Sequence, residues 1–152
     1  YSLRFSEGEY ALLKRETTRK FNTTTKLLFE HAAPMGADIS LPQEITGRLW
    51  LKVTAAPSIL GRARSLLYKP SELNFSAVDA AGREIHHRIL PKACQAGFLV
   101  SPIVETQADL LDYMEGRPTP RLRNLRIEPL PGEGKYWNDA YIQLYEISTR
   151  TQ

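Results

Sequence analysis

LNFSAVDAAGREIHHRILPKACQAGFLVSPIV, residues 73–104, is the stretch that decides the fold. Apolar residues occupy every second position from Leu73 to Ala77, which is the period of a half-buried strand. Asp79 to Gly82 then predicts a tight turn, because Asp accepts backbone hydrogen bonds and glycine takes a positive φ without strain. Residues 84–89 return as the second strand of a hairpin, and residues 98–104 form a third apolar run. We expect the rest of the chain to build a sheet around these segments.

Similar patterns place further elements along the chain. Strands are predicted over residues 10–14, 23–32, 48–54, 63–68, 121–128 and 140–148. The last of these is apolar on both faces, so we expect it to lie centrally or to be covered. One helix is predicted over residues 105–115, where Thr106 and Asp109 have capping-box spacing. Loops or connections are predicted over residues 33–45, 57–61, 91–97 and 129–138. Residues 6–20 fit either a helix or a strand.

Many short strands at roughly ten-residue spacing with one helix predict an all-β fold. We expect a two-sheet antiparallel β-sandwich of jelly-roll type, with the short helix near residues 105–115 as a plug at one end. A chain of 152 residues fits a single domain, residues 1–152. Because the chain begins at Tyr1 rather than at Met, we expect it to be excised from a longer protein.

The charge pattern favours solubility over binding of phosphates. The net charge is +3 and the pI is about 9.1, and the Lys and Arg residues are spread along the sequence. We therefore expect no nucleic-acid partner. A basic nucleic-acid-binding domain is kept as an alternative hypothesis, which requires Lys52, Arg121, Arg123 and Arg126 to cluster on one face.

The residues that most often carry chemistry are sparse. His86 and His87 are neighbours in a predicted strand, so they point to opposite faces and cannot chelate one metal ion. His87 falls on the predicted core face, where we expect a hydrogen-bonded buried histidine. The single cysteine, Cys94, excludes an internal disulfide, and we interpret it as an incidental or buried thiol. We predict no metal site, no cofactor and no catalytic residue.

A small enzyme is nevertheless a second alternative. Its polar site would lie on the concave face of a sheet and would be built from His31, Glu84, His87 or Asp112. This hypothesis requires at least three of these groups to converge in one pocket. The sequence contains no serine-hydrolase or phosphate-binding motif that would support it.

Aromatic residues are the more informative candidates for binding. Trp50 falls on the outward face of its predicted strand, and Tyr136 and Trp137 lie in a glycine-containing loop. Exposed aromatic rings beside polar side chains are typical of sugar-binding surfaces, because the rings contact sugar C–H groups and the polar groups bond hydroxyls. Burial in the core or in an interface is the competing interpretation. We predict Trp50, Tyr136 and Trp137 as the ligand-binding residues.

Three segments carry a resemblance to a known class of domain. They are DAAGRE from Asp79, GFLVSPIV from Gly97 with the short acidic helix after it, and LRIEP from Leu125. Together they resemble the soluble β-sandwich domains appended to bacterial multi-pass inner-membrane proteins, which are similar to jelly-roll, carbohydrate-binding-module-like domains. The resemblance covers Leu73 to Tyr145, and it implies an extracytoplasmic accessory domain.

From these observations we expect a non-catalytic binding or interaction domain of a larger bacterial membrane-associated protein. The resemblance implies the periplasmic or extracytoplasmic face of the inner membrane. The expected partner is a glycan or a neighbouring domain of the same chain, and membrane contact is expected only through flanking segments. We expect ligands to bind at the loops 33–45 and 129–138 rather than on the central hairpin.

Overall fold

The hairpin predicted over residues 73–89 is present as β6 (Leu73–Asp79) and β7 (Glu84–Ile89). In this computed structural model, which describes residues 2–7, 10–14, 21–42, 47–69, 71–117 and 121–151, the two strands pair antiparallel. Asp79 Oδ1 accepts hydrogen bonds from the backbone N–H groups of Ala81 and Arg83, at 2.9 and 2.8 Å. Gly82 has a φ of 84°, as the predicted turn requires.

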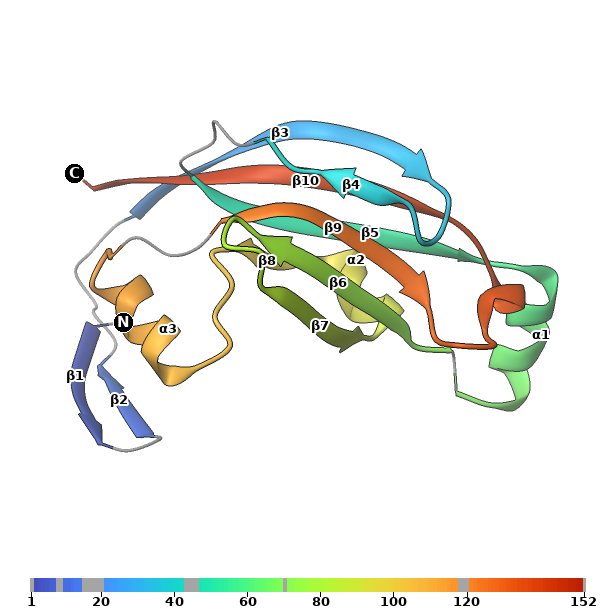
Figure 1. Ribbon diagram of the computed structural model, residues 1–152, viewed down its shortest axis with the longest axis horizontal. Coiled ribbons are helices and arrows are strands. Elements are labelled where there is room, and N and C mark those ends of the chain that lie inside the picture. Colours follow the sequence, from blue (N-terminus) through green and yellow to red (C-terminus); the bar gives the residue numbers. More distant parts are fainter. Residues whose placement is uncertain are drawn as a thin grey trace.

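Two four-stranded antiparallel sheets form a β-sandwich, which confirms the prediction of a two-sheet antiparallel sandwich (Figure 1). The first sheet has the order β3 (Phe21–Ala33), β10 (Trp137–Thr151), β5 (Arg48–Pro57), β8 (Phe98–Ser101). The second has the order β4 (Asp38–Ser40), β9 (Leu122–Pro129), β6, β7. A separate two-stranded sheet contains β1 (Ser2–Glu7) and β2 (Tyr10–Lys14).

The core lies between the two large sheets. On β5 the predicted inward residues Leu49, Leu51 and Val53 are buried, so Trp50 and Lys52 face outward as expected. On β10, Ile142 and Leu144 are buried in the same core, and the strand lies between β3 and β5. The prediction that the last strand of the chain lies inside its sheet is therefore confirmed. From the second sheet, the residues that complete the core include Leu73, Phe75, Ile85, Leu125 and Ile127.

One helix was expected, and the described residues contain three. α3 (Gln107–Met114) is the predicted one, and both hydrogen bonds of the capping box between Thr106 and Asp109 are present. The predicted connection at residues 91–97 is instead the helix α2 (Pro91–Ala96). A proline at the first helical position fits this start, because that N–H has no partner within the helix in any case.

The predicted turn at 57–61 and strand at 63–68 are wrong. This segment forms α1 (Ile59–Leu67), which begins where the side chain of Ser58 accepts the N–H of Gly61 at 3.1 Å. The strand prediction assumed that the apolar residues of the segment are buried. The structure leaves them exposed, so no packing constraint imposes a strand period on them.

Smaller differences concern the loops. The predicted loop 33–45 contains the short strand β4, and the predicted loop 129–138 contains a single 3₁₀ turn, η1 (Gly134–Tyr136), before β10 begins at Trp137. The predicted strand 98–104 ends at Ser101, where a cis peptide bond to Pro102 follows. Among the described residues, the longest apolar helices fall short of what would cross a lipid bilayer.

Candidate functional site

The outer face of the first sheet gathers the aromatic residues around Trp50. In the register of β5 with β10, Trp50 pairs with Tyr145 and Lys52 pairs with Gln143. Cross-strand partners project on the same face of a sheet, so Tyr145 and Gln143 face outward with Trp50. Tyr141 follows on the same face of β10, because it is separated from Gln143 by the buried Ile142. We call Trp50, Lys52, Tyr141, Gln143, Tyr145 and Glu30 the outer aromatic face.

Polar groups on this face form a hydrogen-bonded network. Gln143 Nε2 donates to Glu30 Oε2 on β3, at 2.9 Å. The bond from Gln143, together with one from Tyr141, holds the pKa of the Glu30 carboxyl below its usual value. The same contact with Glu30 raises the pKa of the Tyr141 hydroxyl. A carboxylate, an amide and a phenol are therefore fixed side by side on an exposed sheet surface.

The aromatic rings on this face differ in how they are covered. Tyr141 is exposed, at 42%, whereas Trp50 and Tyr145 are half-buried. The Nζ atom of Lys52 lies 5.3 Å from the centre of the Tyr145 ring, within the range of a cation–π contact. The Trp50 indole lies against Gly97, where any added Cβ would collide with its Nε1 atom. Trp50 is thus anchored by a tight contact at the start of β8.

Tyr136 and Trp137 lie together at a different place, the corner between α1, α2 and η1. The Arg64 guanidinium lies 4.5 Å from the centre of the Tyr136 ring and the Lys135 ammonium lies 5.3 Å from it. The Trp137 side chain packs against the core. Neither ring therefore presents the open face that was expected from their place in a predicted loop.

This corner does contain a small cavity of about 150 Å³. Trp137 and Ser71 both line it, and the buried Trp137 Nε1 and Ser71 Oγ atoms have no hydrogen-bond partner among the described residues. Lys92 and Gln95 of α2 complete the polar part of its lining. The cavity has room for a few water molecules or for a small polar group, which would satisfy these two atoms.

The structure brings Tyr136 and Trp137 together and leaves Trp50 apart from them. Trp137 pairs with Pro57 at one end of β5, whereas Trp50 pairs with Tyr145. At about 3.3 Å per residue, this separation along β5 is roughly 20 Å. The candidate residues thus belong to two surfaces, and sequence patterns missed Tyr141 and Tyr145 as companions of Trp50. Their alternation with Ile142 and Leu144 was the available signal.

The groups required by the enzyme hypothesis do not converge. His87 was expected in the core, but its side chain is 48% exposed and its Nε2 atom lies 3.3 Å from Glu105. The prediction failed because β7 is an edge strand, whose inward face is only partly covered. Glu84 contacts His86, Asp112 pairs with Arg117, and His31 lies against Phe29 on β3. The requirement of three groups in one pocket is not met.

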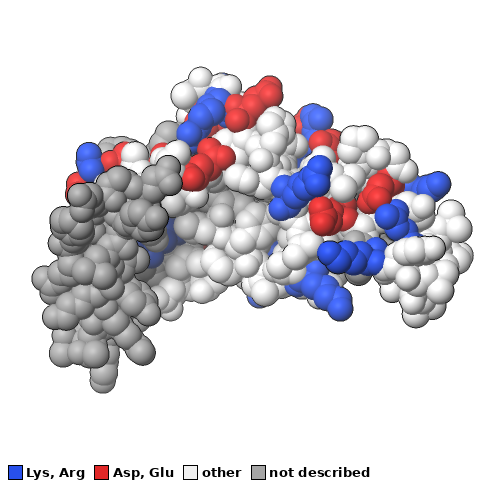
Figure 2. All heavy atoms as spheres, turned by 90° about the horizontal axis from the view of Figure 1, so that it is seen from below, with Lys and Arg blue, Asp and Glu red and all other residues white. Residues whose placement is uncertain are grey.

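A cavity of about 460 Å³ opens between β6, β7, α2 and β8. Its walls are mainly apolar and include Phe75, Phe98, Leu99 and Ile103. β7 and β8 are edge strands of their sheets. Figure 2 shows the molecule from below, where uncharged areas alternate with Lys, Arg, Asp and Glu side chains. Besides the thiol of Cys94, the lining contains the titratable or charged side chains of His87 and Arg88. This cavity suits an apolar group better than a polyhydroxylated ligand.

Cys94 forms part of the wall of the same cavity. It is 2% exposed and belongs to the core, and burial raises the pKa of its thiol to about 11. A thiol that stays protonated at neutral pH is a poor nucleophile. The interpretation of Cys94 as a buried thiol is confirmed.

The basic residues of the nucleic-acid hypothesis lie on opposite sides of the sandwich. Lys52 belongs to the outer face of the first sheet. Arg126 lies on the outer face of the second sheet, where its guanidinium donates to both carboxylate oxygens of Asp38 at 2.9 Å. One continuous basic face of the kind that binds nucleic-acid backbones is therefore not formed by these residues.

Within the described part of the chain, three or more His, Cys, Asp and Glu side chains do not come together as a metal site would require. Comparison of the chain with protein-family models, with curated proteins and with solved structures finds no match in any of the three.

Proposed function

We propose that this chain is a non-catalytic binding domain of a larger protein and that its ligand is a glycan. The observation that carries the proposal is the outer aromatic face. It places Tyr141, Tyr145 and Trp50 on one exposed sheet surface, next to the bonded pair Glu30 and Gln143. Sugar C–H groups pack on aromatic rings, and hydroxyl groups exchange hydrogen bonds with carboxylate and amide side chains.

The shape of this surface supports an extended oligosaccharide rather than a small molecule. The outward residues of β10 follow one another at about 6.6 Å, twice the rise of a strand. Binding would use few buried contacts, so we expect weak affinity, with Kd values from micromolar to millimolar. The corner of Tyr136 and Trp137 is the competing location, because its cavity contains two unpaired polar atoms.

An array of oligosaccharides followed by titration tests the proposal. Tyr141→Ala should weaken binding about tenfold or more, the equivalent of about 1.4 kcal/mol. Tyr68→Ala is the matched control, because Tyr68 is 72% exposed at the end of α1 and lies outside the outer aromatic face. Retention of affinity in Tyr141→Ala and Gln143→Ala would count against this face. Loss of affinity in Trp137→Phe, which preserves the apolar packing, would move the site to the corner.

We also propose that the sandwich is of jelly-roll type. The strand order supports this, because β3 pairs with β10, β4 with β9, β5 with β8 and β6 with β7. Pairing the first strand with the last, the second with the second last and so on is the pattern of a folded-over antiparallel ribbon. Successive strands along β3 to β6 consequently alternate between the two sheets.

The proposed setting is the extracytoplasmic face of a bacterial inner membrane, as part of a longer membrane-associated chain. The resemblance of Leu73 to Tyr145 to such domains supports this, and a glycan ligand is compatible with it. A fusion of the domain within its parent protein to alkaline phosphatase, which is active only outside the cytoplasm, tests the location. An inactive fusion at normal expression would contradict it.

A further inference from the structure

α1 exposes its apolar face and turns its other face to the protein. Ile59, Ala63, Leu66 and Leu67 have the i, i+4, i+7, i+8 spacing of one helical face, and Leu60 borders it. Ile59, Leu60, Leu66 and Leu67 are 86, 58, 87 and 78% exposed. Soluble helices ordinarily bury such a stripe. We call these five residues the α1 stripe.

The opposite face of α1 fixes this orientation. Gly61 lies against the backbone of Tyr136, so closely that a Cβ atom would collide with the Tyr136 carbonyl oxygen. Ser58 Oγ donates to the carbonyl oxygen of Lys135 at 2.7 Å, and the Ser58 N–H donates to that of Tyr136 at 2.9 Å. Arg64 pairs with Glu133 at 2.9 Å. These contacts attach α1 to η1 by its polar side, so the stripe points away from the sandwich.

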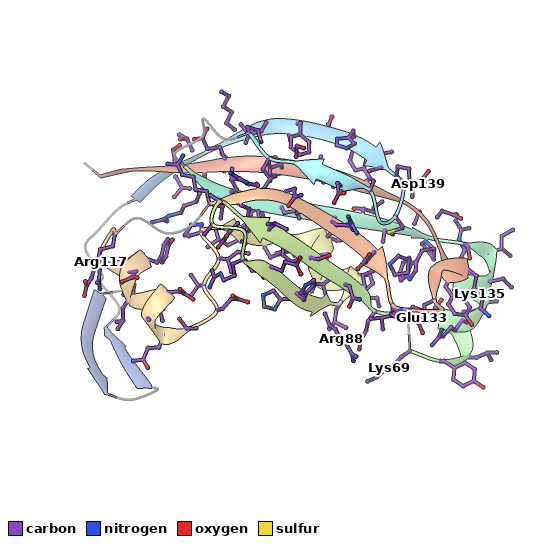
Figure 3. All side chains as sticks on the ribbon, in the orientation of Figure 1. Lys69, Arg88, Arg117, Glu133, Lys135 and Asp139 are labelled. Carbon is purple, nitrogen blue, oxygen red and sulfur yellow. The ribbon has the colours of Figure 1, made fainter. Side chains whose placement is uncertain are left out.

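The segment that carries the stripe is basic, although Arg64 is paired with Glu133 on the opposite face. Between Ser58 and Lys69 the sequence contains Arg62, Arg64 and Lys69 and no acidic residue. The side chain of Lys69 projects from the same lower side of the molecule as that of Arg88 (Figure 3). Figure 2 shows the α1 end as a largely uncharged surface, with Lys and Arg and also Asp or Glu side chains beside it. Tyr68, 72% exposed, adds an amphipathic ring at the end of the helix.

We propose that the α1 stripe docks on an anionic phospholipid bilayer and lies in its interfacial region. The apolar residues would enter the boundary between headgroups and acyl chains, while Arg62 and Lys69 contact lipid phosphates. This proposal rests on α1 alone and not on the proposed glycan site. It adds a direct membrane contact to the contact through flanking segments that the sequence suggested.

A bilayer fits this surface better than a protein does. The stripe belongs to a single helix at one end of the molecule (Figure 1), and Arg62 and Lys69 lie in the same segment. A protein partner would have to supply a groove that accepts the helix. A fluid interface needs no groove, and anionic headgroups complement the flanking cations.

Vesicle sedimentation tests the proposal on the whole chain. The probes are vesicles of phosphatidylcholine with phosphatidylglycerol and vesicles of phosphatidylcholine alone. Leu66→Ser with Leu67→Ser should lower partitioning to the anionic vesicles at least about tenfold. Leu27→Ser is the matched control, since Leu27 is 42% exposed on β3. Arg62→Glu should lower partitioning severalfold, whereas Lys26→Glu, on the same remote strand, should not.

The expected result is binding that prefers anionic vesicles, weakens with salt and depends on the α1 stripe. Failure of the unmodified chain to sediment with anionic vesicles would overturn the proposal, as would equal binding by the double serine variant. Light scattering that shows self-association through the stripe without lipid would assign the surface to a second copy instead. Glycan titration of Arg62→Glu and of the double serine variant should be unchanged, because these residues lie on α1 and not on the outer aromatic face, so the two proposals fail separately.

Discussion

Cys94 shows at the scale of a single residue how burial decides chemistry. Its thiol lies in the core beside the cavity between β7 and β8, and desolvation raises its pKa to about 11. An ordinary cysteine has a pKa of about 8.5. The sequence showed only that a lysine, Lys92, was close along the chain, and this could not reveal that α2 turns the sulfur inward.

The first prediction concerns the reactivity of this thiol. At pH 8 a pKa of about 11 leaves roughly 0.1% thiolate, so iodoacetamide should react at least about a hundredfold more slowly than with a free cysteine. Mass spectrometry of the native protein over time measures the rate. Unfolding in urea should restore an ordinary rate. A native rate equal to the unfolded rate would contradict the placement of Cys94 in the core.

The second prediction concerns Asp79, which is 1% exposed. The backbone N–H of Arg83, helped by that of Ala81 and by the Arg83 guanidinium, holds the pKa of this carboxyl below its usual value. A pKa that is lower in the folded protein stabilises it above the unfolded value of about 3.9. That stabilisation is lost as the pH falls through the lower, folded value.

Asp79→Asn should therefore lower the unfolding midpoint at pH 7 and flatten its fall below pH 4. Thermal unfolding between pH 2.5 and 7 measures both effects. The exposed Asp139, which points to solvent in Figure 3, gives the control Asp139→Asn. If the unfolding midpoint of Asp79→Asn fell with pH as that of the unmodified protein does, the Asp79 carboxylate would not contribute to the pH dependence of stability.

At the scale of helices and strands, the sequence predicted correctly those features that depend on contacts between residues close together in the chain. The Asp79 turn, the capping box of Thr106 and Asp109, and the alternation of β5 depend on neighbours in sequence, and all are present. α1 was assigned wrongly because pattern analysis places apolar residues in the core. Its stripe faces solvent because the contacts of Gly61, Ser58 and Arg64 attach the other face of the helix to η1 and to the residue before it.

The third prediction tests that contact. Gly61→Ala forces a Cβ atom onto the Tyr136 backbone, and overpacking of this kind costs about 1–3 kcal/mol. Chemical denaturation should show a loss of this size. Gly134→Ala in η1 is the matched control, because a Cβ there meets no described atom within 4 Å. Equal stability of the two variants would contradict the close packing of α1 against η1.

At the scale of the whole molecule, the sandwich could be predicted, but the outer aromatic face, which we propose as the binding surface, could not. Alternating segments were enough to predict two antiparallel sheets. The outer aromatic face depends on the register between β5 and β10, which joins Trp50 to Tyr145 across most of the chain. Such a pairing is set by closure of the sheets rather than by local patterns. The sequence therefore identified Trp50 but not the residues beside it.

The most direct test of the proposed function is an NMR titration of the ¹⁵N-labelled chain with an oligosaccharide retained on the array. We predict that the amide shifts of residues 141–145 on β10 and 50–54 on β5 change together, in fast exchange as weak affinity requires. Changes confined to Tyr136 and Trp137, or to the cavity between β7 and β8, would contradict the outer aromatic face as the site. No change at millimolar oligosaccharide would contradict glycan binding itself.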